Sequence, residues 1–182
     1  DRQLAHSLFP STAYGFESGG APKNIPGLTY QDFTEFHRKH YHPSNSRLFL
    51  YGDGDTQSYL DFLQEKYLHD FAHMEVNTSI VHQRSFRKPK RKPMSYPVSS
   101  DESLEKKTYI LVGYKLDKAI NHEHCLGFGI LSHLLLGSSA SPLRKALITS
   151  ELGSEGMGGG FDDNRADTMF AVGLKGTELE HE

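Results

Sequence analysis

The sequence has few of the features that would indicate a secreted or membrane-spanning protein. Its single cysteine, Cys125, excludes an intramolecular disulfide and suits a reducing compartment. The longest apolar run, residues 126–136, is interrupted by Ser132 and His133 and is too short to span a bilayer. No start methionine, signal peptide or transit peptide is present, so we expect an excised or processed segment. A net charge of −3 argues against a nucleic-acid binder that uses its whole surface.

Complete catalytic motifs are absent from the sequence as well. Neither H-E-x-x-H nor its inverted form H-x-x-E-H occurs. The glycine run 156–160 lacks the Gly-Lys-Ser/Thr ending of a phosphate loop, and Asp53-Gly54-Asp55 does not continue as an EF-hand. Residues 103–106 match S-x-x-K without its partner motifs, and the sequon at 77–79 has meaning only in a secreted protein.

Two stretches contain residue types that bind metals. His37, His40 and His42 lie close together, but Pro43 breaks the helix and no suitably spaced carboxylate or thiolate completes a site. The second stretch, 122–125, reads His-Glu-His-Cys, and neighbours in a helix point in different directions. We therefore predict no catalytic residue, no cofactor-binding residue and no metal ligand within this sequence.

The clearest local pattern is a helix, a stop and a strand over residues 28–53. Thr29 and Asp32 have the spacing of a capping box, and Pro43 ends the helix because it lacks an N–H and disfavours helical backbone before it. One apolar face is predicted, formed by Phe33, Phe36, His40 and Tyr41. The apolar run 47–51 predicts a buried strand.

A second helix and a basic stretch follow. Asp55 or Thr56 is predicted to cap the helix, whose apolar face comprises Leu60, Leu63, Tyr67 and Phe71. Between residues 72 and 100 the composition changes to basic residues with three prolines and few apolar side chains. This composition favours an extended, solvated linker over a localisation or nucleic-acid patch, because no aromatic interleaving or folded binding motif accompanies the charges.

The second half of the chain predicts two strands and two helices. Residues 107–116 and 169–174 have the composition of strands. Residues 119–136 predict a helix that is buried over much of its circumference and stops at Gly137. Ser141 and Pro142 form a strong helix start, and Gly153 closes that helix. The predicted fold class is α+β, with an antiparallel sheet packed with helices.

A set of short motifs occurs in a fixed order along the sequence. These runs are Tyr14-Gly15, 18–22, Ile25-Pro26, Leu28-Thr29, 36–39, 41–45, 51–53, Leu136-Gly137, 140–147, Leu152-Gly153 and 172–176. Taken in order, they resemble the presequence proteases, the large single-chain branch of the pitrilysin-type zinc metallopeptidases. The match departs at Ala21, where the family more often has Asp, and in the basic linker.

The resemblance implies a fold of four similar α/β domains in two halves that close around an unfolded peptide. It implies zinc held by the two histidines of H-x-x-E-H and a later glutamate, all upstream of Asp1, with substrate-orienting Arg and Tyr residues downstream of Glu182. The sequence would then be the C-terminal half of a first domain (1–71), a basic proline-containing linker (72–103) and the N-terminal half of a second domain (104–182).

By this resemblance, the chain is a fragment of a zinc metalloendopeptidase that degrades short unstructured peptides such as cleaved presequences. Zinc is expected in the full-length parent and not in this segment, which is predicted to be inactive. Expected partners are peptides, the remaining domains of the same chain and further copies of the fragment, but neither nucleic acid nor membrane. The protein is expected to be soluble and to lie within mitochondria or plastids. The alternatives are a non-catalytic core or processing subunit of the same fold, and a nucleic-acid-binding or partner-binding module that uses the basic linker.

Overall fold

The computed structural model describes residues 2–178, which divide into two compact units. Residues up to 18 and from 80 onward form the first unit, and residues 19–79 form the second. The predicted boundaries at 71/72 and 103/104 concern the parent fold and stay a prediction. No helix within residues 2–178 is long and apolar enough to cross a membrane.

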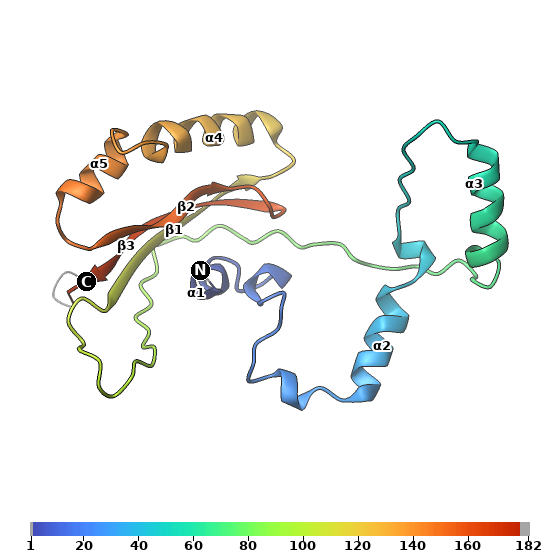
Figure 1. Ribbon diagram of the computed structural model, residues 1–182, viewed down its shortest axis with the longest axis horizontal. Coiled ribbons are helices and arrows are strands. Elements are labelled where there is room, and N and C mark those ends of the chain that lie inside the picture. Colours follow the sequence, from blue (N-terminus) through green and yellow to red (C-terminus); the bar gives the residue numbers. More distant parts are fainter. Residues whose placement is uncertain (1, 179–182) are drawn as a thin grey trace. The chain divides into compact units, whose positions relative to one another are not determined.

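The first unit is built on a three-stranded antiparallel sheet (Figure 1). Its strands are β1 (Thr108–Lys118), β2 (Glu155–Asp162) and β3 (Asp167–Thr177), arranged in the order β1-β3-β2. The central strand β3 pairs with β1 through Val112↔Val172 and with β2 through Phe161↔Phe170. The predicted α+β class is therefore confirmed, as are the strands expected at 107–116 and 169–174.

Three helices accompany this sheet. The helices α4 (His122–Leu136) and α5 (Pro142–Thr149) lie over one face, and α1 (Arg2–Leu8) lies beside the other (Figure 1). A short 3-10 turn, η1 (Ala13–Gly15), follows α1. The predicted helix start at Ser141 and Pro142 is confirmed. Proline is tolerated at the first helical position because an N–H there would have no partner within the helix.

The second unit contains helices and turns. In chain order they are η2 (Ile25–Gly27), α2 (Tyr30–His40), η3 (Pro43–Asn45), α3 (Thr56–Leu63) and the π-helical turn η4 (Gln64–Leu68). The capping box is confirmed: the backbone N–H of Asp32 donates to Thr29 Oγ1 at 3.1 Å, and the N–H of Thr29 donates to Asp32 Oδ2 at 3.1 Å. Asp55 caps α3 by accepting the N–H of Ser58 at 2.8 Å.

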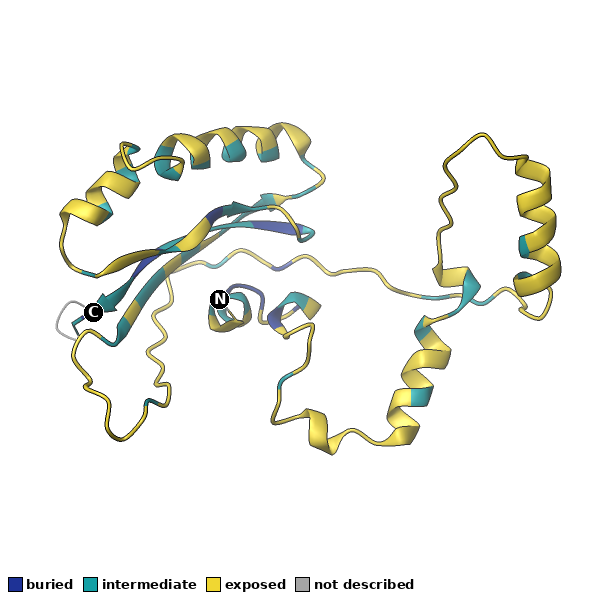
Figure 2. Cartoon of the chain, in the orientation of Figure 1, coloured by how far each residue is buried: buried dark blue, intermediate teal, exposed yellow. Residues whose placement is uncertain are grey.

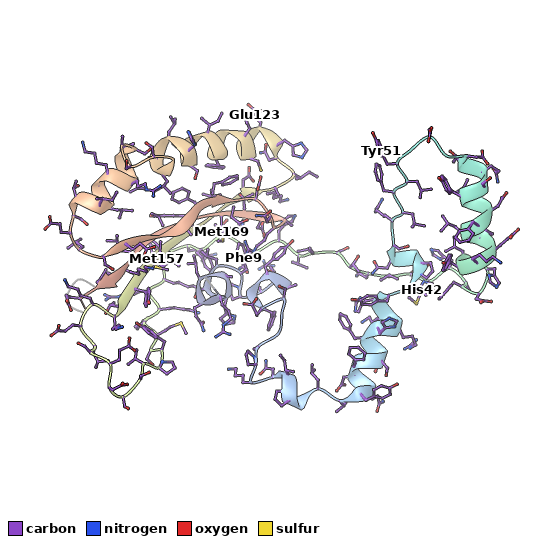
Figure 3. The ribbon with its side chains drawn as sticks, in the orientation of Figure 1. Phe9, His42, Tyr51, Glu123, Met157 and Met169 are labelled. Carbon is purple, nitrogen blue, oxygen red and sulfur yellow. The ribbon has the colours of Figure 1, made fainter. Side chains whose placement is uncertain are left out.

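The strand predicted over residues 47–51 is wrong. These residues form neither helix nor strand. Phe49 is 87% exposed, and Tyr51, which is labelled in Figure 3, is 95% exposed. A strand needs a neighbouring strand to satisfy its backbone groups, and the described part of residues 19–79 contains none. The apolar run therefore lacks the sheet that would bury it.

The prediction that 119–136 is a helix buried over much of its circumference is also wrong in part. The helix begins at His122, and none of its residues is buried. Part of the helix contacts β2, while Leu126 and Leu134 are 67% and 60% exposed. Gly137 ends the helix with φ −64°, so this glycine is not in the left-handed conformation of the usual helix stop.

Little apolar surface is buried in this chain (Figure 2). The buried hydrophobic residues described are Leu8, Phe9, Ala171 and Leu174. The accessible surface of the 20.5 kDa chain is 14714 Å². A compact monomer of this mass would expose about 8,800 Å². Much of the apolar surface therefore has no cover within the chain.

The carboxylate of Asp167, at the start of β3, holds the extended connection onto the first unit. Residues 72–107 contain no helix or strand, yet the N–H of Gln83 donates to Asp167 Oδ2 at 2.7 Å. The other carboxylate oxygen lies 3.0 Å from His82 Nδ1 and 3.4 Å from Lys115 Nζ. The Oε1 atom of Gln83 accepts the N–H of Ser11 at 3.1 Å. Three segments that are far apart in sequence therefore meet at one carboxylate, which is 1% exposed.

These contacts also set the pKa of Asp167. Burial raises the pKa of this carboxyl, but the N–H of Gln83, His82 and the Lys115 ammonium favour the ionised form and together hold the pKa below its usual value. Because the folded-state pKa is lowered, the stabilisation is present above the unfolded value near 3.9 and is lost as pH falls through the folded value.

Replacing Asp167 with Asn should release the connection locally. The variant keeps the size of the side chain but removes the charge that His82 and Lys115 face, at a cost of about 2 kcal/mol, which corresponds to roughly thirtyfold faster exchange. We expect faster amide hydrogen exchange in residues 80–86 at pH 7, measured by mass spectrometry. The difference from wild type should shrink below about pH 4. The exposed Asp101→Asn is the control, and unchanged exchange in Asp167→Asn would contradict this account.

Candidate functional site

The first unit has a groove of about 490 Å³ between α4 and β2. Its lining is almost entirely apolar, with one histidine and one carboxylate at the border. The lining residues are Cys125, Leu126, Gly129, Ile130, His133, Leu134, Phe161 and Asp163. A groove of this composition can bind an apolar side chain, but it offers few groups for chemistry.

Contacts between α4 and β2 fix the floor of the groove. Ser132 Oγ accepts the N–H of Phe161 at 3.0 Å. The rings of Phe128 and Phe161 lie 5.8 Å apart, centroid to centroid. The helix is thereby held close to the strand, and the side chains on its outer side remain uncovered.

Strand β2 provides a second binding feature, a free sheet edge. Strand β3 pairs with one side of β2, and no strand among the described residues pairs with the other side. The register with β3 shifts between Met157 and Gly160, where Gly158 and Gly160 have φ +88° and +73°. An extended peptide can add to such an edge through backbone hydrogen bonds.

The polar groups beside the groove are engaged in contacts of their own. Asp162 pairs with Arg165 and accepts the N–H of Asn164 at 2.9 Å. Burial raises the pKa of the Asp162 carboxyl, but the donors from Asn164 and Arg165 outweigh burial and hold that pKa below its usual value.

The structure separates the residues of the 122–125 stretch. His124 pairs with Asp117, whose pKa is lowered first by the N–H of Lys118 and then by His124. Glu123 lies on the outer side of α4 (Figure 3). Cys125 lines the groove and donates its S–H to the carbonyl of Ala119 at 3.4 Å. The stretch therefore does not converge on one point.

The histidines of the second unit pack against aromatic rings. His37 stacks on Tyr41 at 4.7 Å between centroids, and His40 lies 4.5 Å from Phe36. His42 Nδ1 accepts the N–H of Ser44 at 3.1 Å. Within residues 2–178, no three or more His, Cys, Asp or Glu side chains gather closely enough to hold a metal ion. The prediction that this sequence supplies no catalytic or metal-binding residue stays a prediction.

The remaining motifs have local structural roles. Asp55 caps α3, as described above. Asn77 Oδ1 accepts the N–H of Ser79 at 3.1 Å, which closes a small turn. Ser103 Oγ accepts the N–H of Glu105 at 3.2 Å in an exposed loop.

Comparison with known families decides what kind of protein contains this arrangement. The family model described as the peptidase M16 inactive domain matches residues 27–181. The chain belongs to the M16, or pitrilysin-type, peptidase family. Its place in the presequence-protease branch, expected from the ordered motifs, is confirmed by its relatives.

Several curated relatives of this M16 chain match it from end to end. Presequence protease 1 of Arabidopsis thaliana, described as chloroplastic/mitochondrial, is 43% identical over 99% of the chain. Protein HypA of Clostridium perfringens is 40% identical over 100%, and the mitochondrial presequence protease of Xenopus laevis is 34% identical over 98%. The chain spans only 17–18% of the length of these relatives.

A solved structure supports the M16 fold. The crystal structure of a protease from Helicobacter pylori superimposes with a TM-score of 0.54 over 98% of this chain and 45% of that protein. At 17% sequence identity, this likeness establishes the fold alone.

Sequence reasoning missed both the groove and strand β2. The glycine run 156–160 does not predict a strand, because glycine is a weak strand former; the sequence indicates only that the run is not a phosphate loop. The signal that could have revealed β2 was the following Phe161-Asp162 together with the strand at 169–174, with which a hairpin is possible.

The bend of β2 requires glycine at position 160 but not at position 159. A Cβ at Gly160 would lie 2.4 Å from Ser132 Oγ, and its φ of +73° disfavours side chains, whereas a Cβ at Gly159 would meet open space. We expect Gly160→Ala to lower the free energy of unfolding by about 2 kcal/mol. The matched variant Gly159→Ala should change it by less than about 0.5 kcal/mol. Urea unfolding followed by circular dichroism compares the two, and equal effects would contradict the described bend.

Proposed function

We propose that this chain is a non-catalytic part of a longer zinc endopeptidase that degrades short unstructured peptides in mitochondria or plastids. The support comes from the matched inactive-domain model and from full-chain similarity to presequence proteases whose names place them in these organelles. The small share of each relative that the chain spans supports a larger parent.

The arrangement of side chains carries the non-catalytic assignment. Peptide hydrolysis in a zinc enzyme needs three protein ligands around the metal and a carboxylate base to activate water. No group of three such ligands occurs in residues 2–178, so the residues described here do not fit a zinc ion. In this proposal, zinc and its ligands belong to other parts of the parent protein.

The chain would contribute binding surfaces to the parent protein. The edge of β2 can pair with an extended peptide, and the groove beside α4 can accept an apolar side chain. The exposed face of α4 would be covered by the remaining domains of the same parent, which make up most of its length.

The purified 182-residue chain should not hydrolyse peptides. With an unstructured fluorogenic peptide of about 20 residues, we expect the same rate as buffer alone, with or without added zinc. The expectation follows because no three metal-binding side chains gather within residues 2–178, and a zinc peptidase needs them to activate water. Cleavage that rises with zinc and stops with a chelator, in a preparation free of other proteases, would disprove the proposal. A full-length relative is the positive control.

The isolated chain should self-associate. Among residues 2–178, β1 and β2 each have one edge without a strand partner, and apolar residues of α4 are open to solvent. Light scattering at micromolar concentration should show species larger than a monomer. The double variant Leu126→Lys, Leu134→Lys should weaken association at least about tenfold, because each leucine contributes roughly 2 kcal/mol when buried.

The control for association is Ile120→Lys, a change of an exposed apolar residue just outside α4. It should leave the distribution of species unchanged. A monomeric wild-type chain, or equal effects of both variants, would contradict the proposal.

A further inference from the structure

The connection into β1 contains a dense run of positive charge. Between Arg84 and Lys92 there are six Lys or Arg residues, and no Asp or Glu occurs between Glu75 and Asp101. Neutralising these six residues would take the formal net charge of the chain from −3 to −9. An acidic chain therefore carries a single concentrated basic segment, here called the basic loop (residues 84–95).

The structure anchors both ends of the basic loop on the first unit. Before it, Gln83 is buried and bonded to Asp167. After it, the Tyr96 hydroxyl donates to the carbonyl of Lys107, and the Tyr96 ring lies 5.3 Å from the ring of Tyr109 on β1. The charges are therefore confined near the sheet rather than spread along a free tether.

Between these anchors the basic loop is open to solvent. Every residue from 84 to 95 is exposed except Phe86, which is half-buried (Figure 2). Pro89 and Pro93 disfavour a helix, and residues 84–95 form neither helix nor strand, so the cations follow one another along a row of exposed residues. At about 3.1 Å per residue, the nine residues 84–92 reach up to roughly 28 Å. A row of this length fits a broad anionic surface better than a single small anion.

The aromatic residues of this region argue against nucleic-acid binding by the basic loop. Lys90 Nζ lies 4.4 Å from the centroid of the Phe86 ring and covers it, and Tyr96 packs edge-on against Tyr109. Single-stranded nucleic acid is bound through free aromatic faces, and duplexes are read by a helix or strand pair. The basic loop provides neither. The side chain of Met94, by contrast, is 56% exposed beside the cations, and an exposed apolar side chain of this kind can enter a lipid interface.

We propose that the basic loop binds the headgroups of an anionic phospholipid membrane. A polybasic segment close to an anionic membrane surface is attracted to it, and each Lys or Arg near the surface strengthens binding about fivefold. This contact is peripheral and is independent of the proposed peptidase role. It replaces the expectation from sequence that residues 72–103 are only a solvated linker and that no membrane is a partner.

Vesicle flotation with the full 182-residue chain tests the proposal. One set of vesicles is pure phosphatidylcholine, and the other contains about 30 mol% phosphatidylglycerol. The wild-type chain should float only with the anionic vesicles and should lose most binding between 50 and about 500 mM salt, because salt screens the charges. In the loop variant, Arg84, Arg87, Lys88, Lys90, Arg91 and Lys92 are replaced by Gln; binding should fall at least about a hundredfold.

A second variant of equal net charge is the control. Six exposed cations outside the basic loop, namely Lys23, Arg38, Lys39, Arg47, Lys66 and Lys145, are replaced by Gln. This control should retain binding within about threefold, and circular dichroism should show that all three proteins have the same helix and strand content. Equal losses in both variants, or equal binding to neutral vesicles, would overturn the proposal. Tighter binding to a 20-nucleotide strand or duplex than to anionic vesicles would overturn it in favour of nucleic acid.

Discussion

The first unit depends on one buried carboxylate at the start of the central strand. Asp167 lies where the connection, strand β1 and the N-terminal segment meet, and its charge is compensated by donors from the first two. Neighbouring contacts reinforce the same point: Tyr14 Oη accepts the N–H of Ala166 at 2.9 Å, and Thr168 donates to the carbonyl of Asp117 at 2.9 Å. Because so few apolar residues are buried, a charged hydrogen-bond network supplies stabilisation that a larger hydrophobic core would otherwise supply.

The exposed apolar surface of the chain is larger than a protein that folds alone would leave open. A chain that folded alone would have to bury the faces of α4 and the second unit, yet Leu126 and Phe49 remain open. The three relatives compared above are more than five times as long as the matched region. Exposed faces of this kind are expected at boundaries between domains of one larger protein. Under the function proposed above, the low burial is a property of an isolated part rather than of an unstable fold.

Local chemistry explains which parts of the fold could be predicted from the sequence. The Thr29–Asp32 box, the Asp55 cap and the Pro142 start depend on residues within one helical turn, so neighbouring sequence contains all the information. Strands β1 and β3 pair with each other, and their composition, rich in β-branched and aromatic residues, is typical of strands. The run 47–51 has the same composition but no strand partner in its unit, and composition alone cannot report a missing partner.

The candidate site could not be predicted for a related reason. The groove arises because Gly158 and Gly160 bend β2 and because Ser132 ties α4 to Phe161, which is a contact between residues 29 apart in sequence. Family resemblance found the protein class through ordered runs such as 41–45 and 140–147, without reference to any site.

Anchoring of the connection links the stability of the sheet to its surface charge. Six like charges in a free linker would repel one another, spread apart and dilute their field, so that salt would screen them individually. Fixing Gln83 and Tyr96 on the first unit shortens the accessible range and keeps the cations beside one another, at a cost in repulsion that must be compensated. The ionised Asp167 accepts the N–H of Gln83, the residue just before Arg84, and so fixes the point at which the basic loop begins. The carboxylate that orders the start of β3 therefore also holds one end of the positively charged loop on the first unit.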